Sequence, residues 1–98
     1  MYEILWEYEV RPEHAAAFER LYGADGEWVR HFPQADGYFV TLLLRDTDRP
    51  TRYLTVDRWR SRAAYDSFVQ ASGSAYTALD RRGEALTVRE RRLGALDA

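Results

Sequence analysis

The sequence predicts an α+β fold, in which a four-stranded antiparallel sheet carries two helical regions on one face. Four stretches of the chain are rich in β-branched and aromatic residues with a period of two, as in half-buried strands. Helical patterns separate the first stretch from the second and the third from the fourth, whereas only a short polar connection separates the second from the third. The predicted order of elements is therefore β-α-β-β-α-β.

The length and composition indicate one small domain that spans residues 1–98. A chain of this size buries only about 60–65% of the surface that its unfolded form exposes, so a partner subunit would add to a thin core. There is no cysteine, which excludes disulfides and thiolate chemistry. The first residues, MYEILWEYEV, do not resemble a signal peptide, and no apolar run approaches a membrane span. We expect a cytoplasmic protein without a membrane partner.

The charge pattern does not favour nucleic acid as a partner. The net charge is −2, and all 14 basic residues are arginines interleaved with acids. Nucleic-acid binding normally needs a one-sided basic surface, so we expect no nucleic-acid partner. The densest basic cluster, RERR at residues 89–92, is interpreted as the solvated face of an outer strand.

The first half of the predicted fold is a strand followed by two helical pieces. Residues 2–10 alternate between an apolar face and a face rich in glutamate. A helix over residues 11–23 has Pro12 in its first turn and Gly23 at its end. Residues 25–37 contain a second, short helical piece that stops near its proline. The apolar face of the strand consists of Tyr2, Ile4, Trp6, Tyr8 and Val10.

The second and third strands form an antiparallel pair in this prediction. Residues 37–46 are apolar on both faces, with Tyr38 on the same face as Val40. Residues 47–50 form a polar turn, and residues 51–59 form the third strand. With right-handed crossovers, these elements give the split βαβ, ferredoxin-like arrangement.

The second helical region leads into the last strand. Its helix begins at Ser61, a good N-cap, and Ser72–Ser74 interrupts it. One or two further helical turns carry Tyr76, and residues 84–93 form the last strand.

The second strand also bears on assembly. Two helical regions cover only one face of a four-stranded sheet, yet this strand is apolar on both faces. The simplest cover for the second face is another copy of the same sheet, which predicts a homodimer with two sheets in a dimeric α+β barrel. We expect an interface larger than roughly 1,600 Å².

Aromatic residues with polar tips are the first candidates for a binding site. Buried tyrosine and tryptophan tips need hydrogen-bond partners, which either the core or a ligand could supply. The same spacing is also typical of core residues, so the alternative of a purely structural aromatic core without a pocket stays open. The candidates are Trp6, Tyr8, Tyr22, Trp28, Trp59 and Tyr65.

Asp57 is the most informative single residue. It lies between Thr55 and Trp59 on one face of a strand that we expect to be covered on both sides. A buried carboxylate must be paired or have a raised pKa. Asp57 is therefore either an arginine's ion-pair partner or a functional acid or base, and the same alternatives hold for Glu7.

Cofactor and metal motifs are absent from the sequence. His14 and His31 are far apart, and there is no cysteine and no tight His/Asp spacing to complete a metal site. No glycine-rich phosphate loop and no dinucleotide-binding fingerprint occurs. We therefore expect no metal and no cofactor.

The segments ILWEYEVRPEHAAAFERLY, GYFVTLLL and RYLTVDRWRSRAAYDSF resemble the antibiotic biosynthesis monooxygenase family of dimeric α+β barrels. The resemblance covers nearly the whole chain, and DRWRSRAAYDSF is its most specific part. It implies the fold directly. The superfamily holds several activities, so the function needs its own argument.

One branch of the family suggests a mechanism. Its cofactor-independent oxygenases deprotonate a phenolic substrate, whose electron-rich anion then reduces dioxygen. They use a tryptophan at the end of the third strand and a tyrosine on the next helix, which match Trp59 and Tyr65. They also use an asparagine on that strand, where this sequence has Thr55.

A second branch degrades haem with an asparagine, a tryptophan and an axial histidine. This sequence has no asparagine, and Trp6 stands where that asparagine would fall. The region of the axial histidine reads AYTALD, at residues 75–80. The resemblance therefore does not extend to haem degradation.

Together these observations favour an enzyme that oxidises a small aromatic or polyketide-like compound without a cofactor. Alternatives are a binding or accessory module with the same pocket, an isomerase or cyclase, and a purely structural aromatic core. The expected catalytic residues are Asp57, Tyr65, Trp59 and Tyr22. The expected substrate-binding residues are Trp6, Tyr8, Trp28, Tyr53 and Thr55.

Overall fold

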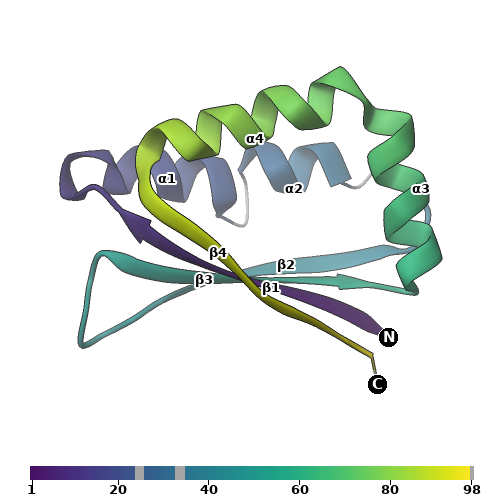
Figure 1. Cartoon of the computed structure of the whole chain (residues 1–98), viewed down its shortest axis with the longest axis horizontal. Helices are drawn as coiled ribbons and strands as arrows, with labels where there is room; N and C mark the ends of the chain where they lie inside the picture. The colour runs from purple at the N-terminus through teal and green to yellow at the C-terminus, as the bar shows by residue number, and fades with distance from the viewer. Residues whose placement is uncertain (24–25, 33–34, 98) are drawn as a thin grey trace.

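A computed structural model describes residues 1–23, 26–32 and 35–97. Its four strands form one antiparallel sheet in the order β2-β3-β1-β4, and the helices lie on one face of it (Figure 1). The predicted α+β fold is therefore confirmed. The strands are β1 (Tyr2–Val10), β2 (Tyr38–Arg45), β3 (Arg52–Trp59) and β4 (Thr87–Asp97).

The helical layer has the two predicted regions, each divided by a break. Ser61 caps α3, because its Oγ accepts a hydrogen bond from the amide of Ala64 at 3.1 Å. The chain then turns at Gly73, whose φ of +50° suits glycine. The helices are η1 (Pro12–His14), α1 (Ala15–Tyr22), α2 (Glu27–His31), α3 (Arg62–Ser72) and α4 (Ser74–Leu86). The predicted stop near Pro33 lies outside the described residues.

The boundary between α4 and β4 differs from the prediction. Residues 84–86 belong to α4, which has 13 residues, and β4 extends to Asp97. Gly83 lies inside α4, and the hydroxyl of Tyr22 packs against it. The end of β4 is weak in β-formers, and its pairing with β1 determines its conformation.

The helix-covered face of the sheet carries the alternating residues of β1 and β3. Trp59 lies opposite Tyr2, and Thr55 lies opposite Trp6. These residues and the inner sides of α1, α2 and α3 form an aromatic core. Its buried members are Tyr2, Ile4, Tyr8, Val10, Phe18, Leu21, Tyr22, Trp28, Phe32, Tyr53, Trp59 and Phe68.

An irregularity in β2 changes which of its residues face the helices. The register with β3 shifts between Tyr38 and Val40, as at a β-bulge. Tyr38 and Thr41 therefore lie on the helix-covered face, whereas Val40 lies on the opposite face. Strict alternation had placed Tyr38 with Val40, so this part of the prediction is wrong.

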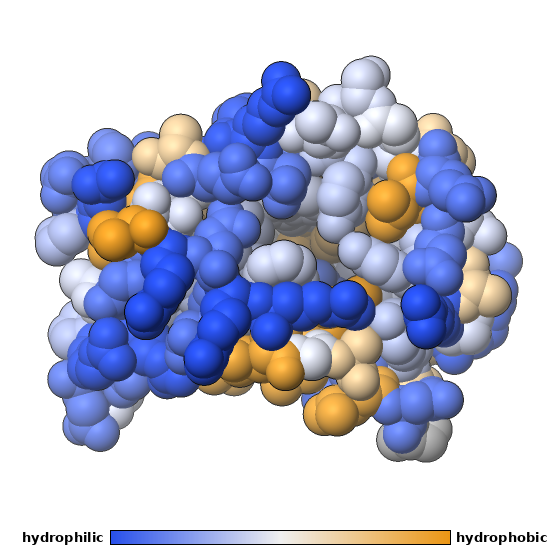
Figure 2. All heavy atoms as spheres, in the orientation of Figure 1, coloured by the Kyte–Doolittle hydropathy of each residue, from blue (hydrophilic) through white to orange (hydrophobic). Residues whose placement is uncertain are grey.

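The opposite face of the sheet has no helix over it (Figure 1). Leu44 is 48% exposed and Leu96 is 60% exposed. Figure 2 shows hydrophobic side chains along the lower edge of the molecule, on the side of the sheet away from the helices. We call this surface, with Leu42, Leu44, Leu54, Val56, Leu5 and Leu96, the open face.

Ion pairs lie beside the apolar residues of the open face. Arg52 Nη2 lies 2.5 Å from Glu7 Oε2, and Arg91 lies on the other side of the same carboxylate. These arginines lower the pKa of Glu7. Glu7 is therefore an ion-pair partner, which resolves the alternatives that its sequence position left open.

Within the described residues, no helix has the length and apolar character needed to cross a membrane.

Candidate functional site

A pocket lies between the sheet and the helical layer. Its closed interior has a volume of about 40 Å³, and with its open mouth it encloses about 420 Å³. The interior alone has room for only a few water molecules, so an aromatic ligand would also occupy the mouth. The lining residues are Trp6, Tyr8, Tyr22, Trp28, Phe32, Thr41, Thr55, Asp57, Tyr76, Asp80 and Glu90.

Asp57 lies in this pocket at the centre of β3, between Ile4 of β1 and Thr41 of β2. Thr41 Oγ1 donates a hydrogen bond of 2.7 Å to Asp57 Oδ1, and the Tyr38 hydroxyl donates to Thr41 Oγ1 at 2.9 Å. Within the described part of the chain, Asp57 has no ion-pair partner. Of the two alternatives for Asp57, the arginine pair therefore does not occur.

The surroundings of Asp57 suit a group that exchanges protons. Burial raises the pKa of Asp57 to about 6, and the hydrogen bond from Thr41 acts in the opposite direction because it stabilises the carboxylate. At neutral pH the group is ionised, but the pH lies only slightly above its pKa. A carboxylate in this state can accept a proton from a bound phenol and release it again.

The tyrosines of the pocket remain protonated. Burial raises the pKa values of Tyr8 and Tyr22. The Tyr8 hydroxyl is hydrogen-bonded to Thr55 Oγ1 at 3.3 Å. Tyr22 is therefore suited to donating a hydrogen bond or relaying a proton, and unsuited to being the proton acceptor.

Three of the expected site residues lie outside the lining of the pocket. Tyr53 is 1% exposed and packs on Phe18, with ring centroids 4.9 Å apart. Trp59 is fully buried and packs edge-on against Tyr65 at 5.4 Å. Tyr65 reaches the pocket through a 3.0 Å hydrogen bond between its hydroxyl and that of Tyr76.

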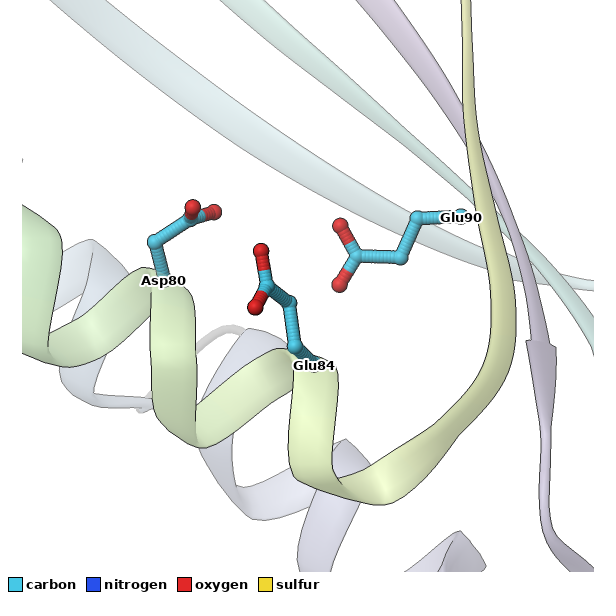
Figure 3. A group of neighbouring side chains, drawn as sticks. All are labelled: Asp80, Glu84 and Glu90. Carbon is cyan, nitrogen blue, oxygen red and sulfur yellow. The ribbon is translucent and has the colours of Figure 1, made fainter.

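The structure also adds residues that the sequence analysis did not select. Asp80 and Glu84 on α4 meet Glu90 on β4, and the three carboxylates point toward one another (Figure 3). One oxygen from each carboxylate lies within 4.8 Å of one oxygen from each of the other two. A spacing of four residues places Asp80 and Glu84 on the same side of a helix. The prediction that the last strand begins at residue 84 separated them and so concealed this relation.

The carboxylate cluster of Asp80, Glu84 and Glu90 is electrostatically strained. Burial and the neighbouring acids Asp80 and Glu84 raise the pKa of Glu90 to about 7. Burial and Glu84 raise the pKa of Asp80. This end of the pocket thus holds more negative charge than its surroundings neutralise.

The antiparallel sheet, the helices on one face and the aromatic pocket between them define an α+β protein of the ferredoxin-like class. A family model described as antibiotic biosynthesis monooxygenase matches residues 1–77. The chain belongs to this family. A comparison with curated proteins finds no match.

Solved structures support the same fold. SnoaB, a cofactor-independent oxygenase from Streptomyces nogalater, is 18% identical, with a TM-score of 0.82 over 99% of this chain and 91% of its own. An antibiotic biosynthesis monooxygenase is 21% identical, with a TM-score of 0.77 over 100% and 98% of the two chains. A conserved protein from Methanosarcina mazei Go1 is 9% identical, with a TM-score of 0.80 over 97% and 89%.

Proposed function

We propose that the protein is a cofactor-independent monooxygenase that acts on a small aromatic or polyketide-like compound in the pocket. The observation that carries the proposal is Asp57, a carboxyl group without an ion pair that faces an aromatic pocket and has a raised pKa. Family membership and the fold shared with SnoaB, a cofactor-independent oxygenase, support the same chemistry.

In the proposed reaction, the Asp57 carboxylate accepts the proton of a phenolic hydroxyl or of an acidic ring methylene. The resulting anion is electron-rich and reduces dioxygen directly. For a methylene substrate, one oxygen atom becomes the new carbonyl oxygen, and the other leaves as water with the two methylene hydrogens. The four electrons that the carbon loses are those that dioxygen gains, so no further reductant is needed.

The other residues have supporting roles in this proposal. Thr41 orients Asp57 through its 2.7 Å hydrogen bond. Trp6 and Trp28 provide faces on which a ring can stack. Trp59 and Tyr65, which the family resemblance suggested as substrate contacts, act here as positioning residues, because Tyr65 holds the pocket's Tyr76.

We also propose that the protein is a homodimer in which the open faces of two copies pack together. The open face is uncovered by helices, and its leucines lie beside ion pairs within the sheet. Such a surface suits a second copy, because the apolar residues of the two copies would meet and the neighbouring charges are already paired.

Oxygen uptake by the purified protein with anthrones, naphthols and hydroquinones tests the enzymatic proposal. Asp57→Asn keeps an acceptor for Thr41 but cannot take a proton, so we expect uptake to fall by about 10²-fold or more. The matched control is Asp66→Asn on the exposed side of α3, which should retain full activity. Undiminished uptake by the Asp57→Asn protein would show that another group is the base.

One observation favours a second candidate, a binding or accessory module with the same pocket. Thr55 stands where oxygenases of the family use an asparagine, and Tyr8 already engages its hydroxyl. Quenching of tryptophan fluorescence by the same compounds, with no uptake above the uncatalysed rate, would support this candidate.

A further inference from the structure

The carboxylate cluster, two of whose members line the pocket, has no counter-charge. Other acids of the protein pair with arginines, as Glu7 does with Arg52 and Asp36 with Arg60. Within the described residues, none of Asp80, Glu84 and Glu90 takes part in a salt bridge, although 14 of the 98 residues are arginines. Such a cluster costs folding free energy, which a bound cation would offset.

One polar atom of the cluster is buried without a partner. Glu90 Oε1 is shielded from solvent and accepts no hydrogen bond from the described residues. A ligand with a hydrogen-bond donor for Glu90 would satisfy this atom.

The pocket lining has the composition of a site for an organic cation. It contains three carboxyl groups, from Asp57, Asp80 and Glu90, and no basic side chain. Six aromatic rings complete it, and aromatic faces attract ammonium groups by cation–π interaction. A hard metal ion instead prefers a shell of oxygen ligands and water, which an aromatic wall does not supply. The rings are those of Trp6, Tyr8, Tyr22, Trp28, Phe32 and Tyr76.

We propose that the ligand of this pocket is an aromatic compound that carries a protonated amine. Its ring lies in the aromatic interior, and its ammonium group binds to the carboxylates of Asp80, Glu84 and Glu90. This inference names the substrate class of the proposed oxygenase, and so it rests on the same pocket.

A matched pair of ligands tests the inference by binding alone. The probes are a hydroxynaphthalene with an aminomethyl substituent and its neutral N-acetylated form, titrated against tryptophan fluorescence. We expect the amine to bind about tenfold more tightly or better, since tenfold corresponds to about 1.4 kcal/mol. Equal affinities for the two probes would overturn the inference.

Variants connect the preference to the cluster. Glu84→Gln and Glu90→Gln together should abolish the preference for the amine over the neutral probe. Both changes relieve repulsion, so the fold should persist, and exposed Glu84→Gln alone should already reduce the preference. Glu13→Gln on η1 is the control and should change nothing. A preference that survives the double substitution would overturn the inference.

Two further outcomes separate this inference from its alternatives. Tight binding of Mn²⁺ or Ca²⁺ by calorimetry, lost in the double variant, would assign the cluster to a metal and overturn the amine assignment. An amine preference without oxygen uptake would uphold the inference and refute the oxygenase. Oxygen uptake with neutral substrates and no amine preference would support the oxygenase and overturn the inference.

Discussion

Asp57 shows how a single carboxyl group can be poised by its neighbours. Tyr38 donates to Thr41, and Thr41 donates to Asp57, so one oxygen of the carboxylate is held in place. The group still lacks a positive partner, and burial raises its pKa to about 6. A raised pKa means that ionisation of the carboxyl group destabilises the folded protein. Carboxyl groups of this kind are common at catalytic sites.

The same residue should make stability depend on pH. The folded-state pKa of Asp57, about 6, is above its ordinary value of 3.8, so the folded state binds its proton more tightly than the unfolded state. Its contribution to the free energy of unfolding therefore falls as pH rises through this interval. We expect Asp57→Asn to raise that free energy by about 1–3 kcal/mol at pH 8 and to have little effect near pH 3.5.

Urea unfolding of the two proteins across this pH range measures the difference. Glu90 also titrates with a raised pKa, but it is present in both proteins, so the difference between them isolates Asp57. A difference that does not change with pH would show that Asp57 titrates normally. Together with the expected loss of oxygen uptake, a gain in stability would indicate that this position serves activity at the expense of the fold.

Among the secondary-structure elements, α4 contributes most of the pocket residues that were not predicted from the sequence. Its inner side presents Tyr76, Asp80 and Gly83, and the last of these lets α1 approach closely. A Cβ atom at Gly83 would lie 2.1 Å from the Tyr22 hydroxyl oxygen. The glycine is thus a packing requirement inside a continuous helix.

Replacing this glycine should therefore destabilise the protein. Gly83→Ala gains about 1 kcal/mol of helix propensity but forces Tyr22 to move, and we expect a net loss of about 1–3 kcal/mol. Tyr22→Phe removes the clashing oxygen and leaves the ring carbon Cζ at 3.0 Å, so Gly83→Ala should cost less in that background. Thermal or urea unfolding of the four proteins in this cycle gives the coupling. An equal cost in both backgrounds would contradict the packing argument.

The elements also show where sequence reasoning succeeds and where it stops. Alternation grouped Trp6 with Tyr8 along β1 and Thr55 with Asp57 along β3, because strand side chains have a fixed period of two. It did not show which face of β3 meets the helices, and the register with β1 places both pairs on the same face. Alternation failed at the irregularity after Tyr38, since a bulge interrupts that period without a sequence mark. The carboxylate cluster depends on tertiary contact between α4 and β4, which local patterns do not encode.

At the scale of the whole molecule, helices cover one face of the sheet and the open face is left to solvent. Its exposed leucines are the basis for the proposed homodimer. We expect sedimentation to find a dimer at micromolar concentration, and Leu44→Arg with Leu96→Arg to give a monomer, because each would place charge in the apolar interface.

Ala78→Arg adds one arginine on the exposed side of α4, away from the open face, and this control should remain a dimer. A wild-type protein that sediments as a monomer would refute the proposed assembly. A dimer that persists in the leucine variants would place the contact on another surface.

The alternation of β3 has a consequence for how such a protein can diverge. Asp57 faces the pocket, and its neighbour Val56 faces the open side, so one backbone segment serves two surfaces. Inserting or deleting one residue in this strand would exchange the two sets of side chains and ruin both surfaces together. New specificities on this scaffold must therefore arise by substitution within the strands, and changes in length are confined to the connections between them.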